Sequence, residues 1–384
     1  MIPIIKSLDF KNFGEENKSW YIPAATRLDD GRWMATTQSV QGTDFYGEPM
    51  FAISSDEGRT WSAPAPIPSL LSEKLQGTDI TVAVCDIHPF TSPIDGTVFA
   101  FGFTVYYSPK GNVCWDRDVE KTELPREVGV YATWRPETGW SERKVLPLPN
   151  HGMSYRTAAT QLAFMPDGSF LIPIYATVRR GTYCGYPSDF YGVTAPIYRQ
   201  NGALLEHVRH GRILTHDAGR GFFEPSVVRL ADDSYAMTIR AEDRKMYVST
   251  SADGAEWSEP RPWQWDDGTP LVTESTQQHW IRLADRTFLV FTMKYNGNDS
   301  IFRYRAPLLV AEAIPQKGLL VHSSLQTVFE RQRLNGTEAF YGNFHCAQLD
   351  GNTALVTDAA LFKGNGENGK FWARTTVMAA RISI

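Results

Sequence analysis

Six times along the chain, an apolar stretch leads into a turn rich in Asp and Gly, and a second apolar or alternating stretch follows. This pattern is typical of two β-strands joined by a tight hairpin. The hairpins recur about every 50 to 70 residues, a long period of the kind that propeller blades produce. No segment shows a sustained helical period, so the pattern predicts an all-β chain. The six segments are RLDDGRWMAT, DGTVFAFGF, MPDGSFLIPIY, LADDSYAMTIR, LADRTFLVFTM and QLDGNTALVTD.

The repeats predict a single six-bladed β-propeller over residues 1–384. No linker rich in Pro or Ser, no charge block and no low-complexity tract divides the chain. The closing segment, TTVMAARIS, is expected to pair with an N-terminal strand in the last blade, because that pairing removes an exposed sheet edge.

Two segments carry a recurring turn motif, Ser-x-Asp-x-Gly-x-x-Trp. SSDEGRTW at 54–61 matches it, and STSADGAEW at 249–257 nearly does. In such a turn the Asp carboxylate accepts backbone N–H groups while the Trp packs into the blade. We interpret both segments as folding devices without a direct role in chemistry.

Composition removes several classes of function. Hydrophobic residues make up 42% of the chain, and no stretch of about 18 apolar residues suggests a membrane span. The net charge of −5 comes from interspersed charges, so the basic patch that nucleic-acid binding needs is missing. We expect a small carbohydrate as partner, with neither nucleic acid nor membrane. The sequence leaves the oligomeric state open.

The cysteines and the first residues bear on cofactors and location. Cys85, Cys114, Cys184 and Cys346 lie far apart without a CxxC pair, which favours buried free thiols over a zinc site or disulfides. No structural metal and no cofactor is expected. The opening MIPIIKSLDF lacks the basic and apolar regions of a secretory signal. We expect a cytoplasmic protein if Met1 is native, and a secreted or periplasmic one if a signal peptide was removed.

Polar residues gather at one predicted end of the propeller. The innermost strand of every blade starts there, so residues about 8–12 positions before each hairpin turn are expected to converge. Acids, bases and cations from distant positions are costly to bury without partners, so a wet functional pocket is expected. By position they are Tyr21, Asp86, His88, His151, Tyr155, Arg156, Glu224, Gln277, His279, Asn343 and His345, with Gln38, Tyr175, Arg240 and Lys294 from the following strands.

The segment FFEPSVVRLADDSYAMTIR, followed by STSADGAEW, resembles the middle of the sialidases, and YRAPLLVAEA resembles a later sialidase blade. The resemblance implies a sialidase-like propeller of the Asp-box, or BNR-repeat, type. Sialidases hold the substrate carboxylate with three arginines, use a Tyr nucleophile activated by a Glu, and employ an Asp as acid and base. Glu224 matches that Glu, Arg240 the second arginine and Arg305 the third.

Two departures separate the chain from true sialidases. Where the family has Arg-Ile-Pro, this chain has Tyr21 followed by Ile and Pro, and Phe344 stands where the nucleophilic Tyr is expected. The loss of the phenolic oxygen argues against a covalent glycosyl intermediate. Tyr341 is the neighbouring tyrosine that would substitute if the register differs. Asp44 lies near the expected acid/base loop, and Asp86 is a second candidate.

Three functions stay open from the sequence. The first is a glycosidase acting on an acidic or deoxy sugar, with inverting chemistry available to two carboxyl groups. The second is a lyase of uronate-linked glycans with His or Tyr as acid and base, and the third is a carbohydrate-binding propeller without activity. The catalytic candidates are Glu224, Asp86, Asp44, His88, His151 and His345, and the substrate-binding candidates are Tyr21, Arg156, Tyr175, Arg240, His279, Lys294, Arg305 and Tyr341.

Overall fold

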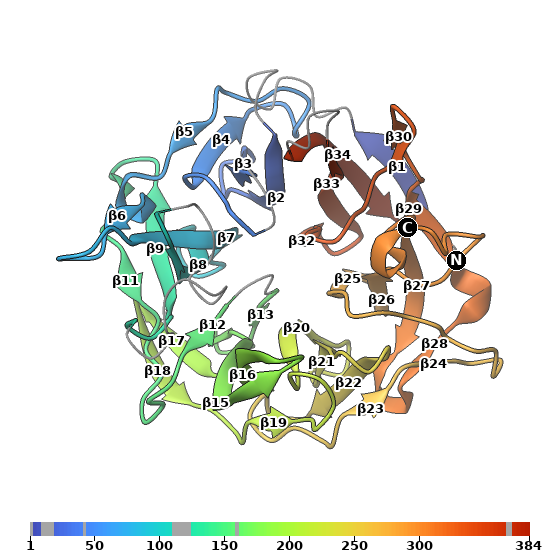
Figure 1. Ribbon diagram of the computed structural model, residues 1–384. Helices are drawn as coiled ribbons and strands as arrows, with labels where there is room; N and C mark the ends of the chain where they lie inside the picture. The colour runs from blue at the N-terminus through green and yellow to red at the C-terminus, as the bar shows by residue number, and fades with distance from the viewer. Residues whose placement is uncertain (1–2, 9–18, 41–43, 110–123, 158–160, 366–370) are drawn as a thin grey trace.

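The computed structural model describes residues 3–8, 19–40, 44–109, 124–157, 161–365 and 371–384. Their strands form sheets arranged in a ring around a central axis (Figure 1). The all-β propeller predicted from the repeats is therefore confirmed. The single domain over residues 1–384 stays a prediction. The only helices among the described residues are short 3₁₀ turns, η1 (Pro68–Leu70), η3 (Phe302–Tyr304), η4 (Pro315–Lys317) and η5 (His322–Ser324).

The first two sheets are antiparallel and follow each other along the chain. One has the strand order β2-β3-β4-β5, and the other β10-β9-β8-β7-β6, with β11 paired to β9. The bounds are β2 (Trp20–Arg27), β3 (Trp33–Ser39), β4 (Met50–Ser54), β5 (Ala65–Pro66), β6 (Glu73–Lys74), β7 (Thr81–Thr91), β8 (Val98–Tyr107), β9 (Gly129–Arg135), β10 (Gly139–Trp140) and β11 (Lys144–Val145).

The third part of the ring consists of two sheets, β12-β15-β16-β19 and β13-β14-β17-β18. Four consecutive stretches of chain each contribute one strand to both sheets. We therefore interpret the two sheets as a single blade whose strands are interrupted part of the way along. The bounds are β12 (Tyr155–Arg156), β13 (Ala163–Phe164), β14 (Phe170–Leu171), β15 (Ile174–Tyr183), β16 (Tyr186–Thr194), β17 (Ile197–Asn201), β18 (Leu204–Arg209) and β19 (Leu214–Thr215).

The remaining sheets complete the ring. They have the orders β20-β21-β22-β23, β24-β28-β27-β26-β25 with β29 beside β27, and β1-β34-β33-β32, and a small β30-β31 ribbon lies outside them. The bounds are β20 (Phe223–Arg229), β21 (Tyr235–Arg240), β22 (Met246–Ser251), β23 (Arg261–Pro262), β24 (Gln264–Trp265), β25 (His279–Leu283), β26 (Arg286–Phe291), β27 (Leu308–Ile314), β28 (Leu319–Leu320), β29 (Gln326–Phe329), β30 (Arg333–Leu334), β31 (Thr337–Glu338), β1 (Ile4–Leu8), β32 (His345–Asp350), β33 (Thr353–Asn365) and β34 (Phe371–Ser383).

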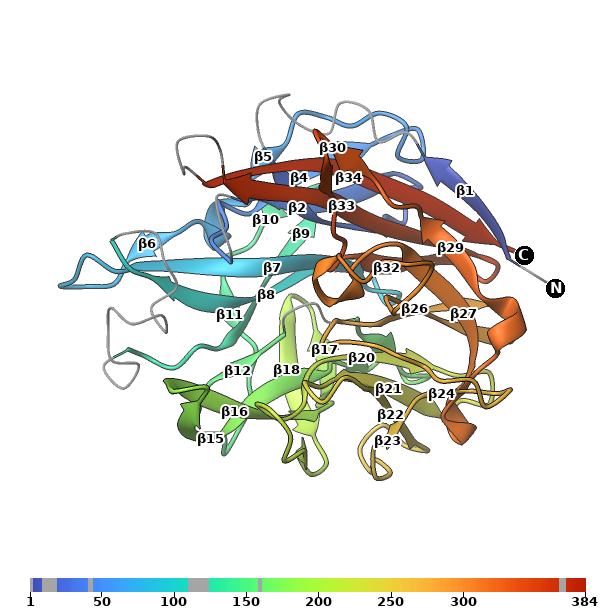
Figure 2. The ribbon, with the colours of Figure 1, turned by 45° about the vertical axis from the view of Figure 1, so that its right-hand side comes forward.

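The ring closes through strands from both ends of the sequence. β1 lies along β34, with Ile4 opposite Ser383 and Leu8 opposite Ala379 (Figure 2). The predicted pairing of the closing segment with an N-terminal strand is therefore confirmed. It covers one edge of β34, which would otherwise be open to pairing with another chain.

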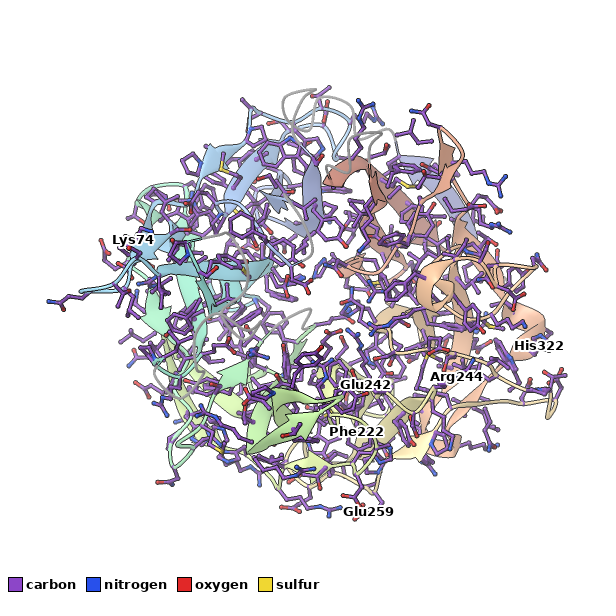
Figure 3. All side chains as sticks on the ribbon, viewed as in Figure 1. Lys74, Phe222, Glu242, Arg244, Glu259 and His322 are labelled. Atoms are coloured by element: carbon purple, nitrogen blue, oxygen red, sulfur yellow. The ribbon has the colours of Figure 1, made fainter. Side chains whose placement is uncertain are left out.

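The core lies between neighbouring sheets. Trp280 on β25 is fully buried, packs at 5.8 Å from the ring of Trp263, and donates its indole N–H to the carbonyl of Ser226 on β20. Charged side chains such as Lys74, Glu259 and His322 lie at the outer edge of the ring (Figure 3). Apolar packing between sheets thus joins the blades and leaves polar side chains for the channel and the periphery.

The cysteine prediction is correct in part. Cys85 and Cys346 are buried and free, as expected, but Cys184 is exposed at the tip of the β15–β16 hairpin. Cys114 lies outside the described residues. Among the described residues, no helix has the length and apolar character needed to cross a bilayer.

The two Ser-x-Asp turns form the hydrogen bonds that the sequence predicts. Asp253 Oδ1 accepts the backbone N–H of Ala255 at 3.0 Å and of Glu256 at 2.9 Å. The Trp257 indole donates to the carbonyl of Gly254, a residue at φ 76° whose left-handed backbone glycine adopts readily. Trp257 is 5% exposed and packs between the sheets on either side. The turn therefore fixes a core side chain.

Removal of the Trp257 ring should destabilise the protein strongly. We expect Trp257→Ala to lower the free energy of unfolding by about 3–5 kcal/mol, because it leaves a cavity in the core. Trp257→Phe should cost less, since it mainly loses one hydrogen bond worth about 1 kcal/mol. Glu256→Ala, at the exposed neighbouring position, is the control. Denaturant-induced unfolding measures all three, and a Trp257→Ala loss no larger than that of Glu256→Ala would contradict this role.

Candidate active site

Three innermost strands share one irregularity at the same point in the blade. In β2, β7 and β20 the register of pairing shifts, just before Ala24, His88 and Ser226 respectively. The residues at these bulges have positive φ angles of 54°, 55° and 46°, although none is glycine. Such backbone is costly and is concentrated at functional sites. The residues concerned are Ile22, Asp86 and Glu224.

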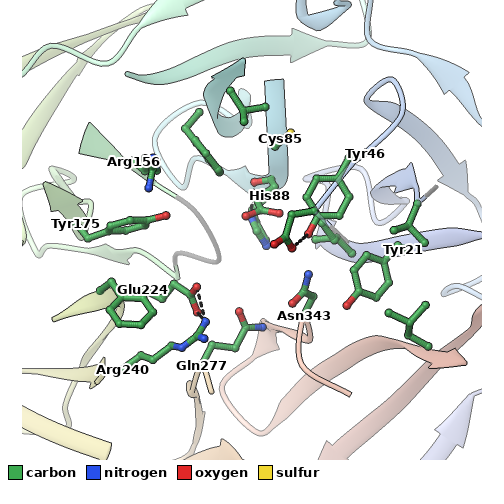
Figure 4. Close-up of a pocket in the computed structure, with 18 of the residues that line it drawn as sticks. Tyr21, Tyr46, Cys85, His88, Arg156, Tyr175, Glu224, Arg240, Gln277 and Asn343 are labelled. Carbon is green, nitrogen blue, oxygen red and sulfur yellow. Dashed lines mark hydrogen bonds and ion pairs between the residues drawn. The ribbon is translucent and has the colours of Figure 1, made fainter. Parts of the chain in front are cut away.

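The bulged strands surround a cavity of about 450 Å³ at one end of the channel (Figure 4). This volume suits one sugar-sized ligand. The structure brings nine of the fourteen candidate residues to its wall. They are Tyr21, Asp44, Asp86, His88, Arg156, Tyr175, Glu224, Arg240 and Arg305.

Glu224 and Arg240 form an ion pair across the bulge. Arg240 Nη1 lies 2.6 Å from Glu224 Oε1 and 2.7 Å from Oε2 (Figure 4). The guanidinium also donates from Nε to Ser275 Oγ at 3.0 Å and lies 4.6 Å from the ring centre of Phe223. Arg240 is 7% exposed, so its charge is largely neutralised within the wall.

Asp86 has a strongly shifted pKa. Burial, together with the charges of Glu224 and Asp44, raises the pKa of Asp86 to about 8, although Arg156 opposes the shift. Its Oδ1 is buried and has no hydrogen-bond partner among the described residues. His88 Nδ1 lies 2.7 Å from the Asp86 carbonyl and supports the bulge. Asp86 is therefore protonated at neutral pH.

Arg156 is occupied by internal partners. It forms an ion pair with Glu127, and its Nη1 donates to the Tyr191 hydroxyl at 3.0 Å. The guanidinium lies 5.4–5.6 Å from the ring centres of Phe103, Tyr175 and Tyr191. Because these partners neutralise its charge, Arg156 helps to hold the shape of the cavity and is not free to bind an anion.

Tyrosines line the side of the cavity near Asp44. The Tyr46 hydroxyl donates to Asp44 Oδ1 at 3.3 Å, and the Tyr107 hydroxyl donates to the Asp44 carbonyl at 3.0 Å. Tyr21 stacks on Tyr46 with ring centres 6.1 Å apart. Burial raises the pKa of Tyr21 and of Tyr46 well above the usual value, so both phenols stay protonated.

Positive charge also accumulates in the cavity wall. Burial, with the charges of Arg240 and Arg305, lowers the pKa of Arg303 to about 10. Burial and the charge of Arg240 likewise lower the pKa of Arg305, and burial with the nearby arginines lowers that of Lys363, although Asp44 opposes it. Arg303 and Lys363 line the cavity with Arg305, and both were missed in the sequence analysis.

Five candidate residues lie away from this cavity. Lys294 is exposed and paired with Asp299 at 2.5 Å, His151 contacts the Ser154 carbonyl at 3.3 Å, and His279 is buried against Ser226. His345 lines a second cavity of about 680 Å³. The structure places all five outside the wall of this cavity. The five are His151, His279, Lys294, Tyr341 and His345.

Phe344, which stands where the nucleophilic tyrosine was expected, and the neighbouring Tyr341 both lie outside the cavity wall. Phe344 is fully buried and packs against the ring of His279, and the preceding Asn343 faces the cavity. Tyr341 is fully buried as well, and its hydroxyl donates to the Glu330 carbonyl. Tyr341 therefore does not replace the missing nucleophile.

Further cavity residues escaped the sequence analysis because they come from loops and second strands. Arg220 precedes β20 in a loop and pairs with Glu242 at 2.6 Å. Arg303 stands two positions before Arg305 in IFRYRAP, and that spacing was the one available signal. No group of three or more His, Cys, Asp or Glu within the described ranges is arranged to hold a metal ion. The missed residues are Tyr46, Tyr107, Glu127, Tyr191, Arg220, Arg303 and Lys363.

Comparisons with known proteins agree with this architecture. Residues 88–319 match the family model of the BNR repeat-like domain. No curated protein sequence matches the chain. A protein of unknown function from Dyadobacter fermentans is 13% identical with a TM-score of 0.65, covering 99% of this chain and 98% of its own.

Solved sialidases share the fold at a similarly low sequence identity. The Hadza microbial sialidase Hz136 is 14% identical with a TM-score of 0.58, covering 93% of this chain and 66% of its own. The Trypanosoma rangeli sialidase, solved with sialic acid, is 11% identical with a TM-score of 0.58, covering 100% and 59%. This chain therefore spans less than two thirds of both sialidases, and the likeness shows the fold alone.

The raised pKa of Asp86 gives a stability prediction. The unfolded chain releases this proton near pH 3.8, whereas the folded protein keeps it until about pH 8. Folding is therefore penalised increasingly as pH rises through that window. Asp86→Asn removes the penalty, so its melting temperature relative to the unaltered protein should rise from pH 4 to pH 8. Thermal unfolding across this range checks it, and a difference that does not change with pH would contradict it.

Proposed function

Because this chain belongs to the BNR repeat-like domain family and has the sialidase-like propeller fold, we propose that it is a glycoside hydrolase acting on an acidic or deoxy sugar. One observation carries the proposal. A protonated carboxyl group and an ion-paired carboxylate, Asp86 and Glu224, face the same sugar-sized cavity. Two carboxyl groups in opposite protonation states are the requirement for acid and base roles in glycoside hydrolysis.

Asp86 is the general acid in this mechanism. Its proton is retained at neutral pH and is available to the glycosidic oxygen as the bond to the leaving group breaks. Glu224 is the general base, because it projects from the equivalent bulge of another blade and Arg240 fixes both of its oxygens. Asp44 adds negative charge near the forming cation and is a weaker candidate for the base.

The site favours inversion of the anomeric carbon. A retaining sialidase needs a tyrosine oxygen as nucleophile, and Asn343 faces the cavity beside the buried Phe344. Tyr21 and Tyr46 do reach the cavity, but their raised pKa values disfavour the phenolate. Water activated by a carboxylate needs no such residue. We therefore propose direct attack by water.

The lyase remains the second candidate, because one cavity histidine is suited to it. Burial lowers the pKa of His88 to about 4, so its imidazole is neutral at physiological pH and available to accept a proton, although as a weaker base than an exposed histidine. A neutral imidazole is able to remove the proton α to a uronate carboxylate. Elimination leaves an unsaturated uronate that absorbs in the ultraviolet, whereas hydrolysis does not.

Incubation with sialosides, rhamnosides and uronate oligosaccharides tests the two chemistries. We expect released reducing sugar without a rise in ultraviolet absorbance. Asp86→Asn and Glu224→Gln should each lower kcat by about 10²–10⁴-fold, the usual contribution of a positioned acid or base. Asp44→Asn should lower it less.

The controls separate the alternatives. Each variant must keep the melting temperature expected of a folded protein before its rate is interpreted. Rising absorbance that disappears in His88→Gln would assign the lyase. A full rate in both Asp86→Asn and Glu224→Gln would remove these carboxyl groups from the mechanism, and binding without turnover of any sugar would favour the non-catalytic propeller.

A further inference from the structure

We propose that the second cavity of this propeller binds a hydroxylated organic acid, which places its hydroxyl groups against His345 and its acid group against Arg27 and Arg282. The cavity measures about 680 Å³, and the proposed hydrolysis does not use it. The chemistry of its ligand follows from the side chains of this cavity alone, so the site stands whether or not glycosides are cleaved.

The second cavity occupies the other end of the central channel. The innermost strands line both cavities, at successive positions along each strand (Figure 1). On β2 residues 21–22 line the first cavity and residues 25–27 the second, and on β20 the corresponding residues are 223–224 and 227–229. The cavities meet where His88, in the wall of the first, lies against His345, in the wall of the second, with ring centres 5.1 Å apart.

His345 lies at the inner end of the second cavity without a hydrogen-bond partner. It is 1% exposed, and neither Nδ1 nor Nε2 has a partner in the described part of the chain. Burial, with the charges of His88 and His279, lowers its pKa well below the usual value, so the ring is neutral and presents one N–H donor and one acceptor. Hydroxyl groups satisfy both nitrogens, because a hydroxyl both donates and accepts.

The polar side chains in the middle of the cavity are already paired and do not serve His345. The Gln161 amide donates to the Trp280 carbonyl at 2.7 Å and accepts the Trp280 backbone N–H at 2.7 Å. The hydroxyls of Thr26 and Thr91 bond to each other at 3.0 Å. A partner for the two nitrogens of His345 therefore has to come from within the cavity.

Arginines supply positive charge at the outer end. Arg27, the last residue of β2, forms no ion pair among the described residues, and Arg282 donates to two backbone carbonyls but to no described carboxylate. Arg229 is paired with Asp233 at 2.6 Å. Asp29 is the one acid among the described residues of this wall. Two guanidinium groups without carboxylate partners against one carboxylate favour an acid group on the ligand.

The distance between the two ends sets the length of the ligand. On β32, His345 and Gln348 stand three positions apart, which spans roughly 10 Å along a strand. Gln348 Oε1 accepts the backbone N–H of Arg282 at 3.2 Å, so Arg282 lies near that outer level. An extended molecule with hydroxyl groups toward one end and an acid at the other reaches both, whereas a small anion such as phosphate reaches one end only.

Calorimetry on the full chain at low ionic strength tests the site with three probes. Gluconate carries both hydroxyl groups and an acid, sorbitol lacks the acid, and hexanoate lacks the hydroxyl groups. We expect gluconate to bind most tightly, and His345→Phe and Arg282→Met each to weaken its binding by about tenfold, the scale of one or two lost polar contacts. His345→Gln, which keeps a donor and an acceptor, should retain most of the affinity.

Three controls locate the binding. Arg212→Met is matched to Arg282→Met, because Arg212 is paired with Glu259 at the outer edge of the ring (Figure 3), and it should bind gluconate as the unaltered protein does. Arg303→Met removes a cation of the first cavity and should also leave this binding unchanged. His345→Phe should melt no lower than the unaltered protein, since it removes buried polar atoms without partners.

The site is wrong if no probe binds, or if His345→Phe and Arg282→Met bind gluconate as tightly as the unaltered protein. It is also wrong if sorbitol or hexanoate binds as tightly as gluconate, because one end of the cavity would then contribute nothing. Gluconate binding that is lost in Arg303→Met and kept in His345→Phe would belong to the first cavity instead. None of these outcomes depends on turnover, so failure of the hydrolase proposal and failure of this site are told apart.

Discussion

Left-handed backbone in β7 and β20 turns two carboxyl groups, Asp86 and Glu224, into one cavity. A regular strand would send alternate side chains to opposite faces, and the shift of register interrupts that alternation at the end of the channel. Each such residue costs about 1–3 kcal/mol, so neighbouring contacts must hold it. Arg240 holds Glu224, and the His88 ring supports the Asp86 carbonyl.

The electrostatics follow from this convergence. Burial disfavours the charged form of Asp86 and raises its pKa, and the negative charges of Glu224 and Asp44 add to this effect. Asp86 therefore retains a proton that an exposed aspartate would lose. Arg240 is paired with Glu224, whereas the other cavity cations Arg303, Arg305 and Lys363 form no ion pair among the described residues.

The fold could be predicted from the sequence because the patterns that indicate it lie within short segments of the chain. The turn residues around Gly31, Gly168 and Gly351 predict hairpins, as do the alternating apolar and polar positions beside them. The structure contains all three hairpins. Asp86 and Glu224 were also found from the sequence, because they stand about 8–12 positions before their turns. His279 and His345 start β25 and β32 but lie outside the cavity wall, which a count of positions before a turn does not reveal. Arg303 and Lys363 come from a 3₁₀ turn and a second strand, which the count of positions before each hairpin turn does not reach.

The anomeric configuration of the first product tests most directly whether this propeller hydrolyses glycosides without a tyrosine nucleophile. Proton NMR during the first minutes of cleavage, before mutarotation, reads it from the sugar released. Direct attack by water predicts a product of inverted configuration. A retained configuration would require a covalent intermediate and would contradict the assignment of Asp86 and Glu224 as acid and base across a water molecule.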